Sequence, residues 1–454
     1  MRDQIPRPPG PEWGALEAYR RRRRDFLGLL TEVAAAHPRV AYVRLLNKSV
    51  YFVNDPELVR EVLVAKSHSV RKGRGFDRLE LFLGAGLLTI EGELHRRHRR
   101  VLQPAFHRDR IRQYGDLMVA ATQRLPWTDG GRVDVTDEMA RLTLSIVTEA
   151  LFGADLAAEE MSEARLALDG FVASFGNAQV SRTVLSRLSG QARRRSIRSR
   201  DRFDQLATRL LQRRRGTGTG TGGTGTGSDF LSTLLESGLP AAEILGEART
   251  FVTAGHETTA NVLVWAIWLL DRHPEVAGRL HAEVDALPAP PTAGDYPRLP
   301  YTRAVAAEVL RLYPSVYVIP RRALTELTVD GWLVPAGDRI ITSPYVCHRD
   351  PRWWGGDAAE FRPRRWLDAA GRFGEQNPGQ PRAAYFPFGT GPRVCIGEPF
   401  AWLELVLVLA TLTRQWRPVI EHDPRPQPSV TLRPDGPVLA RLRRRTVSDH
   451  AVLS

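Results

Sequence analysis

The spacing of apolar residues follows helical periods over most of the chain. Residues 240–272 form the longest such pattern, and they predict one helix of about 50 Å at a rise of about 1.5 Å per residue. Pro240 opens this helix and His273-Pro274 closes it. Residues 400–413 are apolar except for Glu404 and two threonines, which predicts a buried helix. Further helices are predicted over residues 17–37, 93–103 and 299–313 and over most of residues 114–215.

A smaller number of segments have the pattern of strands. Residues 40–53 predict a pair of strands with a turn at Asn47-Lys48, and residues 327–334 and 338–343 predict further strands. Residues 430–432 fall in a C-terminal strand region. The balance predicts a mainly α protein with a smaller β lobe, of the α+β class.

Two segments are predicted to lack regular structure. Residues 1–14 are rich in proline and predict an extended N-terminal arm. Residues 216–228 consist almost entirely of glycine and threonine, and they predict a flexible linker inside a single domain of residues 1–454. This linker is not a P-loop, because no Gly-Lys-Ser/Thr follows it, and no strand precedes it as a dinucleotide-binding turn requires.

Charge narrows the choice of partners. The 454 residues carry a net charge of +13, and lysine supplies only three of the 64 basic residues. This arginine bias indicates a GC-rich bacterial genome. The arginine runs lie far apart in the sequence, so nucleic-acid binding is not predicted. Attraction of an acidic protein partner explains the positive charge better than nucleic-acid binding does.

The two cysteines, Cys347 and Cys395, exclude a disulfide framework and fit a cytoplasmic protein. No run of about 18 apolar residues appears, so a membrane anchor is not expected. Cys347 is expected only to pack in the interior.

Cys395 lies in a loop that is rich in glycine and leads into the helix predicted from residue 400. A lone cysteine is usually a small buried apolar residue. Here the free backbone N–H groups and the positive end of the helix dipole would favour a thiolate. A thiolate in such a position suits an iron ligand.

The segment around Cys395 has the form F-G-x-G-x-R-x-C-x-G, which strongly resembles the haem-binding signature of the cytochrome P450 monooxygenases. The matching residues are Phe388, Gly389, Gly391, Arg393, Cys395 and Gly397. The resemblance implies the cytochrome P450 haem-thiolate fold, with haem b as cofactor. It also implies that Cys395 is the axial iron ligand and that Arg393 meets a haem propionate.

The middle of the longest helix is weak for a helix, because Gly255 and two threonines stand where alanine or leucine would be more stable. His256-Glu257 does not start a zinc motif, because position 260 is alanine rather than histidine. The sequence from Ala254 resembles the oxygen-activation site of the family. The resemblance implies that Glu257 and Thr258 relay protons and that Ala254 and Gly255 belong to the same site, the glycine leaving room for O2. The alternative is a threonine pair that only bends a core helix.

The basic helix predicted over residues 93–103 places His95 and Arg99 on one face, four residues apart. Resemblance to the family implies that this pair binds a haem propionate. Arg97 and Arg100 point away from that face and Arg96 lies to its side, and all three are expected to help dock an acidic electron donor. The alternative is an ordinary solvated basic helix.

Glu308 and Arg311 lie three residues apart on a predicted helix, and such pairs are usually surface salt bridges. The family has an E-x-x-R motif at this place that is tied to a later arginine, which Arg365 matches. The resemblance implies a structural triad. The later motif departs from the family at Arg364, where an acid is usual, and at Trp366, where Phe is usual.

The resemblance also indicates a substrate pocket. Its expected lining is Phe76, Leu79, Leu83, Phe171, Phe175, Val316, Val318, Ile319 and Leu432. This apolar set predicts a bulky, mostly apolar substrate, such as a terpenoid or macrolide of secondary metabolism. The expected polar contacts are Asn177, Gln179 and Tyr317. A fatty acid stays open as an alternative, because its carboxylate could meet Arg71, Lys72, Arg74 or Arg78. Arg321 matches another residue that contacts a haem propionate in the family, and Arg322 is the alternative for that role.

The implied reaction inserts one atom of O2 into a C–H or C=C bond. A separate ferredoxin or flavodoxin is expected to supply electrons, because no flavin or reductase domain is fused to the chain. A peroxide-using or isomerising haem-thiolate enzyme and a non-catalytic haem module remain alternatives. The Glu257–Thr258 pair argues against the first alternative.

Overall fold

The computed structural model describes residues 6–45, 48–73, 76–152, 157–176, 186–216, 230–375 and 383–445. The predicted turn at residue 47 and the Gly/Thr linker from residue 217 onward lie outside this part, as do residues 1–5 of the arm. Contacts between Cα atoms divide the chain into two compact units. Unit 1 comprises Met1–Phe76, Ala307–Asp368 and Gly374–Cys395, and unit 2 comprises Asp77–Ala306, Ala369–Phe373 and Ile396–Ser454. A single domain stays a prediction.

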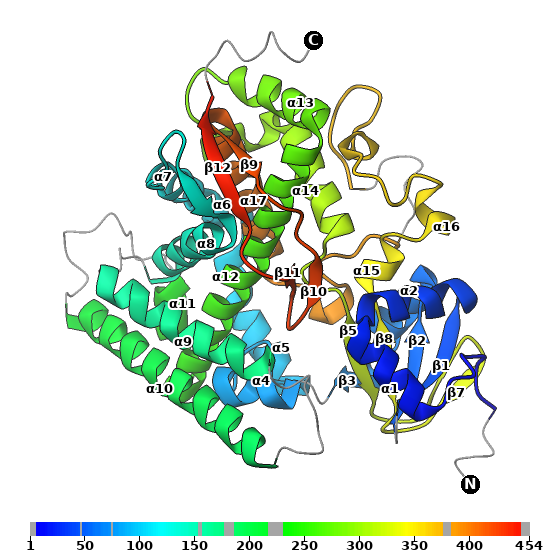
Figure 1. The fold of residues 1–454 in the computed structure, drawn as a ribbon. Coiled ribbons are helices and arrows are strands. Elements are labelled where there is room, and N and C mark those ends of the chain that lie inside the picture. The colour runs from blue at the N-terminus through cyan, green and yellow to red at the C-terminus, as the bar shows by residue number, and fades with distance from the viewer. Residues whose placement is uncertain are drawn as a thin grey trace. The chain divides into compact units, whose positions relative to one another are not determined.

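Unit 1 is built on a five-stranded sheet in the order β1-β2-β8-β5-β3 (Figure 1). Its strands are β1 (Val40–Leu45), β2 (Lys48–Val53), β8 (Arg339–Thr342), β5 (Ile319–Ala323) and β3 (Val70–Lys72). β2 and β8 are parallel, and the other neighbours are antiparallel. The strand pair predicted over residues 40–53 is confirmed, with Val40 opposite Val53. Residues of the arm run extended beside β1, where Tyr42 N donates to Pro9 O over 3.0 Å.

Both faces of this sheet are buried, and successive residues of a strand enter different cores. Tyr51 and Val53 of β2 pack into one cluster with Ile340, whereas Phe52 packs into a second cluster with Leu30 of α2 (Phe26–Ala36). This is the period of two expected for a strand. It explains why residues 50–53 are apolar without interruption.

Two predicted elements of unit 1 are each divided in the structure. The helix predicted over residues 17–37 is wrong as one piece, since α1 (Ala15–Arg24) ends before Asp25, whose carboxylate caps α2 by accepting from Gly28 N at 2.8 Å. The strand predicted over residues 327–334 is a hairpin of β6 (Leu327–Val329) and β7 (Trp332–Val334). Asp330 and Gly331 form its turn with φ of 51° and 78°, as a two-residue Asp-Gly turn requires.

The remaining pieces of unit 1 are short helical segments. They are α3 (Pro56–Arg60), η2 (Glu61–Ala65), η3 (Ser67–Ser69), α15 (Pro344–Cys347), α16 (Pro351–Trp354), η6 (Pro363–Trp366) and η7 (Gly391–Arg393).

Unit 2 is mainly helical. Its helical elements are α4 (Phe76–Leu83), α5 (Gly92–Leu102), η4 (Gln103–Phe106), α6 (Arg108–Gln113), α7 (Gly115–Gln123), α8 (Val135–Phe152), α9 (Ala158–Gly176), α10 (Ser186–Gly216), α11 (Phe230–Glu236), α12 (Ala241–Arg272), α13 (Pro274–Asp285), η5 (Ala293–Arg298), α14 (Pro300–Leu312, which continues into unit 1) and α17 (Glu398–Gln415). A three-stranded sheet in the order β4-β12-β9 and a hairpin of β10 and β11 complete it. These strands are β4 (Arg132–Asp134), β9 (Trp416–Ile420), β10 (Pro426–Pro428), β11 (Leu432–Pro434) and β12 (Leu439–Arg444).

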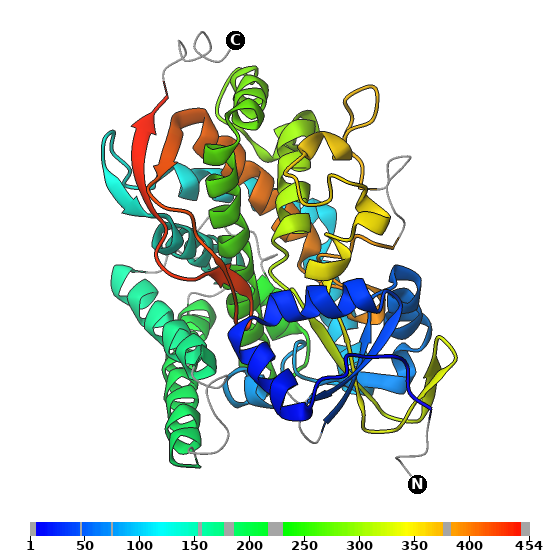
Figure 2. The same cartoon turned by 45° about the vertical axis from the view of Figure 1, so that its right-hand side comes forward.

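The longest helix, α12, confirms the helix predicted over residues 240–272, with Pro240 as its N-cap and His273 as its C-cap. It packs against α8, α17 and β9 within unit 2 (Figure 2). α17 confirms the predicted buried helix, because every residue from Trp402 to Thr413 is buried. No helix in the described part of the chain is long and apolar enough to cross a membrane.

Candidate active site

The loop that carries Cys395 has a conformation that depends on its glycines. Gly389 and Gly391 have φ of 73° and 74°, a region that other residues avoid. A Cβ atom on Gly391 would also lie 2.3 Å from the carbonyl oxygen of Leu63. Cys395 N donates to Phe388 O over 3.0 Å and closes the loop. The cysteine is therefore held by a backbone that a side chain at position 391 would disrupt.

The two cysteines lie in opposite environments. The Cys395 side chain is exposed, whereas Cys347 is fully buried. The Cys347 thiol lies 3.4 Å from the carbonyl oxygen of Asn54, and burial raises the pKa of Cys347 to about 12. Cys347 therefore stays a neutral thiol at physiological pH, and Cys395 is the cysteine that can supply a thiolate.

On α5, burial follows the helical faces. His95 and His98 are buried with Leu102, and Arg99 is half-buried. The other three cations of the helix are exposed: Arg96, Arg97 and Arg100. The helical spacing of four thus places His95 and Arg99 on the inner side of this helix.

His98 was not predicted as part of any site. Its Nδ1 lies 2.6 Å from Oε1 of Glu247, and its Nε2 lies 2.9 Å from Oε2 of Glu243, both on α12. Hydrogen bonding to Glu247 is the largest cause of a raised pKa of His98. Oε2 of Glu247 also accepts from Leu87 N at 3.0 Å. The available signal was the spacing of His98 three residues after His95, which places both on the buried face.

The middle of α12 presents the acid and alcohol that were predicted as a proton relay. Thr258 Oγ1 donates to the carbonyl oxygen of Ala254 over 2.5 Å, the side-chain-to-backbone bond that can loosen a helix. Glu257 Oε1 accepts from Thr431 Oγ1 at 2.7 Å. A Cβ atom on Gly255 would lie 2.8 Å from a methyl carbon of Val147 on α8. Gly255 is therefore also required for helix packing.

His256, between Gly255 and Glu257, is buried on α12, and burial lowers the pKa of His256 to about 4. It is neutral at physiological pH. Its carbonyl oxygen accepts from Thr143 Oγ1 of α8 at 3.0 Å. Among the described residues, no group of three or more His, Cys, Asp and Glu side chains could hold a metal ion.

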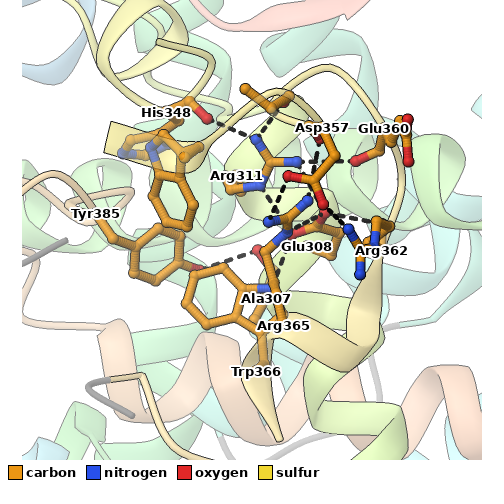
Figure 3. A network of polar contacts seen from close by, with 12 residues as sticks. Ala307, Glu308, Arg311, His348, Asp357, Glu360, Arg362, Arg365, Trp366 and Tyr385 are labelled. Atoms are coloured by element: carbon orange, nitrogen blue, oxygen red, sulfur yellow. Dashed lines mark hydrogen bonds and ion pairs between the residues drawn. The ribbon is translucent and has the colours of Figure 1, made fainter. Parts of the chain in front are cut away.

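In unit 1 the structure brings Glu308, Arg311 and Arg365 together (Figure 3). Arg311 contacts both carboxylate oxygens of Glu308 at 2.8 Å, and Arg365 Nε lies 2.9 Å from Oε1. Glu308 and Arg311 are fully buried. Arg311 also donates to the carbonyl oxygens of His348 and Ala358, over 2.7 and 2.6 Å. A buried charge must be paired and hydrogen-bonded. The network therefore holds the segments around His348, Ala358 and Arg365 against the helix that carries Glu308 and Arg311.

Trp366 explains one departure from the family pattern. Its indole N–H donates to Oε2 of Glu308 over 2.8 Å, and the side chain is fully buried (Figure 3). A phenylalanine in this place could not donate. Arg364, the other departure, is exposed, and nothing in the structure explains it.

Comparison with known proteins identifies the family. The family model described as cytochrome P450 matches residues 5–440. The chain belongs to the cytochrome P450 family. It is 35% identical to cyclooctat-9-en-7-ol 5-monooxygenase of Streptomyces melanosporofaciens over 93% of this chain and 89% of that protein. It is 32% identical to pentalenene oxygenase of Streptomyces avermitilis over 86% of each. The crystal structure of CYP175A1 from Thermus thermophillus matches with a TM-score of 0.75 and 29% identity, covering 94% of this chain and 98% of that chain.

These findings confirm the cytochrome P450 fold and the monooxygenase class. This P450 therefore uses haem iron, a redox partner and an apolar substrate. The residues present fit the haem. An exposed cysteine lies three residues before the start of α17, where the helix dipole favours a thiolate, and Arg393 lies on the same loop.

The residues predicted to line the P450 pocket have different environments. Leu83 and Leu432 are fully buried, Leu79 and Ile319 are nearly so, and Val316 is 43% exposed. Val318 packs partly into the core beside α2. The side chains of Phe76, Phe171 and Phe175 lie outside the described part, as do Asn177, Gln179, Arg74 and the side chain of Arg78.

Two further predicted contacts of the P450 lie on β5 or next to it. Tyr317, just before this strand, is buried, and burial raises its pKa to about 12, so its hydroxyl stays protonated. Arg321 and Arg322 are neighbours on β5 and are both half-buried. Successive residues of a strand point to opposite faces, so only one of the two arginines can face any given ligand. Arg321 Nη1 donates to Pro320 O over 3.0 Å.

Proposed function

We propose that this P450 hydroxylates or epoxidises a bulky, neutral terpene of secondary metabolism. The observation that carries the proposal is the likeness to two proteins whose names give terpene substrates, cyclooctat-9-en-7-ol and pentalenene, at 35% and 32% identity. The apolar character of the residues predicted to line the pocket supports such a substrate, since pockets of this kind bind by apolar burial.

In this proposal Cys395 would hold the iron of haem b as a thiolate, and Phe388, Gly389 and Gly397 would shape the loop around it. When bound, the haem supplies the iron at which O2 is activated. Arg393, the pair of His95 and Arg99, and Arg321 or Arg322 would bind the haem propionates. The loop geometry and the burial of Cys347 support Cys395 as the ligand.

Glu257 and Thr258 deliver protons toward the oxygen side of the site, to which Ala254 also belongs, and Gly255 leaves room there. The apolar lining excludes water and orients the substrate. The hydrogen bond from the Thr258 hydroxyl to the carbonyl oxygen of Ala254 supports this role, because it places a hydroxyl at a point where the helix can loosen.

The electron donor in this proposal is a ferredoxin or flavodoxin with its reductase. The exposed arginines of α5 support an acidic donor of this kind. The cysteine chemistry supports a cytoplasmic location, because Cys347 is a buried free thiol and not half of a disulfide.

The test is a titration of the haem absorption spectrum with neutral polycyclic terpenes and with fatty acids of matched carbon number. Terpenes should shift the spectrum at low concentration, and product analysis should show one added oxygen atom. Shifts with fatty acids alone, abolished by Arg71→Ala or Lys72→Ala, would sink the terpene proposal. Those two residues are neighbours on β3 and point to opposite faces of the strand, so at most one of them can face a bound carboxylate.

A further inference from the structure

The hydroxyl of Thr431 links two residues of α12. Asn261 Nδ2 donates to Thr431 Oγ1 over 3.1 Å, and Thr431 Oγ1 donates to Glu257 Oε1 over 2.7 Å. Thr431 and Asn261 are only 5% and 6% exposed. Thr431 directly precedes β11, so it belongs to the C-terminal hairpin and not to the helix that carries Glu257.

The direction of this chain of hydrogen bonds is fixed by chemistry. An amide nitrogen can only donate, and a hydroxyl has a single proton. Since Asn261 occupies a lone pair of the Thr431 oxygen, the proton of Thr431 is directed at the carboxylate of Glu257. A hydrogen bond donated to a carboxylate stabilises its charged form and restricts its rotamer.

The hairpin is attached to the same face of α12 at a third point. Trp265 Nε1 donates to the carbonyl oxygen of Leu432 over 3.4 Å. Glu257, Asn261 and Trp265 are spaced by four residues, so they lie along one face of the helix. The position of Thr431 relative to Glu257 is therefore set by neighbouring contacts along this face.

We propose that Thr431 is a positioning residue for Glu257, and that proton delivery depends on this hydroxyl from the C-terminal hairpin. The inference rests on the role of Glu257 in the proposed function. In the structure the carboxylate of Glu257 is bonded to Thr431, while the hydroxyl of Thr258 is bonded to Ala254. Thr431 thus holds the carboxyl group of Glu257 in one orientation beside the alcohol that follows it in the sequence.

The experiment compares three variants of the haem-loaded enzyme: Thr431→Val, Thr431→Ser and Glu257→Gln. Valine keeps the shape of threonine but cannot donate, and serine keeps the hydroxyl. Thr411→Val is the matched control, because its buried hydroxyl donates within α17, to Leu407 O over 2.7 Å. The substrate is the neutral terpene that gives the largest spectral shift in the titration above.

Thr431→Val should raise the peroxide released per reducing equivalent by about tenfold, the lower end of the scale for one hydrogen bond to a charged group. Thr431→Ser and Thr411→Val should stay at the wild-type ratio. Substrate affinity should not change in any of them. A merely structural hydroxyl would lower the thermal midpoint without moving this ratio.

A second measurement does not depend on turnover. A protonated carboxyl group has an infrared carbonyl band, and the band that is absent from Glu257→Gln belongs to Glu257. As the pH is lowered, this band should appear at a higher pH in Thr431→Val than in the wild type. Thr431→Ala replaces Thr431→Val if the valine variant does not load haem.

Two results would overturn the inference in distinguishable ways. If Thr431→Val is coupled like the wild type while Glu257→Gln is uncoupled, Thr431 has no positioning role, and the proposed function stays intact. If Glu257→Gln is coupled like the wild type, Glu257 does not deliver protons, and the inference about Thr431 fails as well.

Discussion

The imidazole of His98 and the carboxylate of Glu247 are both fully buried and lie 2.6 Å apart. The second ring nitrogen lies 2.9 Å from Glu243, so a protonated ring is held between two carboxylates. Glu247 in turn accepts from the backbone N–H of Leu87. This cluster joins α5 and the segment before it to α12 through charged and hydrogen-bonded groups.

The pKa of His98 is raised by these carboxylates, which makes the stability pH-dependent. The contribution is fully present below the unfolded pKa of about 6.5, and it is lost as pH rises through the raised folded value. His98→Gln should therefore lower the free energy of unfolding by about 3 kcal/mol near neutral pH, and by less in alkaline solution. Denaturant unfolding at several pH values measures this. His107→Gln is the control, because His107 is exposed; an unchanged pH dependence in His98→Gln would contradict the prediction.

Trp366→Phe restores the residue that is usual in the family but removes a donor to the buried Glu308. We expect a loss of about 1.5–3 kcal/mol in the free energy of unfolding, the range for a hydrogen bond to a charged group. Trp353→Phe is a matched control in the same unit, because the buried indole N–H of Trp353 has no hydrogen-bond partner in the described part of the chain. Equal effects of the two substitutions would show that ring size, and not the bond to Glu308, decides stability.

Replacing Cys395 should abolish thiolate ligation, because Cys347 is buried and neutral. The carbon-monoxide complex of the reduced wild-type protein should show the strongly red-shifted Soret band that marks a cysteine thiolate. Cys347→Ala should keep the shifted band, and Cys395→Ser should lose it. The reverse pattern would assign the ligand to Cys347.

Thr258→Ala should uncouple reductant use from product formation while leaving substrate affinity unchanged. The alanine variant removes the hydroxyl that is bonded to Ala254 O, and we expect about a hundredfold fall in product per reducing equivalent, the lower end of the range for proton-transfer catalysis. Thr258→Ser should retain most of the coupling. Thr148→Ala removes a buried threonine hydroxyl of α8 and serves as the control. Coupling as in the wild type would reduce Thr258 to a helix-bending residue.

Charge reversal at Arg96 and Arg100 should weaken docking of an acidic electron donor. Both are exposed on α5, whereas Arg97 contacts Glu243 and is less suitable because that carboxylate also binds His98. We expect the donor concentration for half-maximal reduction to rise by about threefold to tenfold, and the effect to shrink with added salt. Arg279→Glu, at an exposed position on α13, is the control. A reduction rate that does not depend on salt would argue against docking by charge.

Short-range patterns in the sequence determined the long helices and the strand pair. The ends of α12 were predictable because proline and the His-Pro pair act locally. The loop of Cys395 was predictable for the same reason, because its two positive φ values fall on glycines. Two local signals were passed over: the cap at Asp25, which divides a helix, and the Asp330-Gly331 turn, which divides a strand.

Only the tertiary structure decided which polar groups meet. His98 and Glu247 are 149 residues apart in the sequence, and Thr431 and Glu257 are 174 apart. No periodicity within a helix or strand records such a contact. These polar groups are paired because an unpaired polar group is costly in the interior, and the partner is whichever residue the packing of α12 brings within reach. The sequence thus determined the elements and the cysteine loop, and the packing of unit 2 chose the partners of the buried histidine and the glutamate.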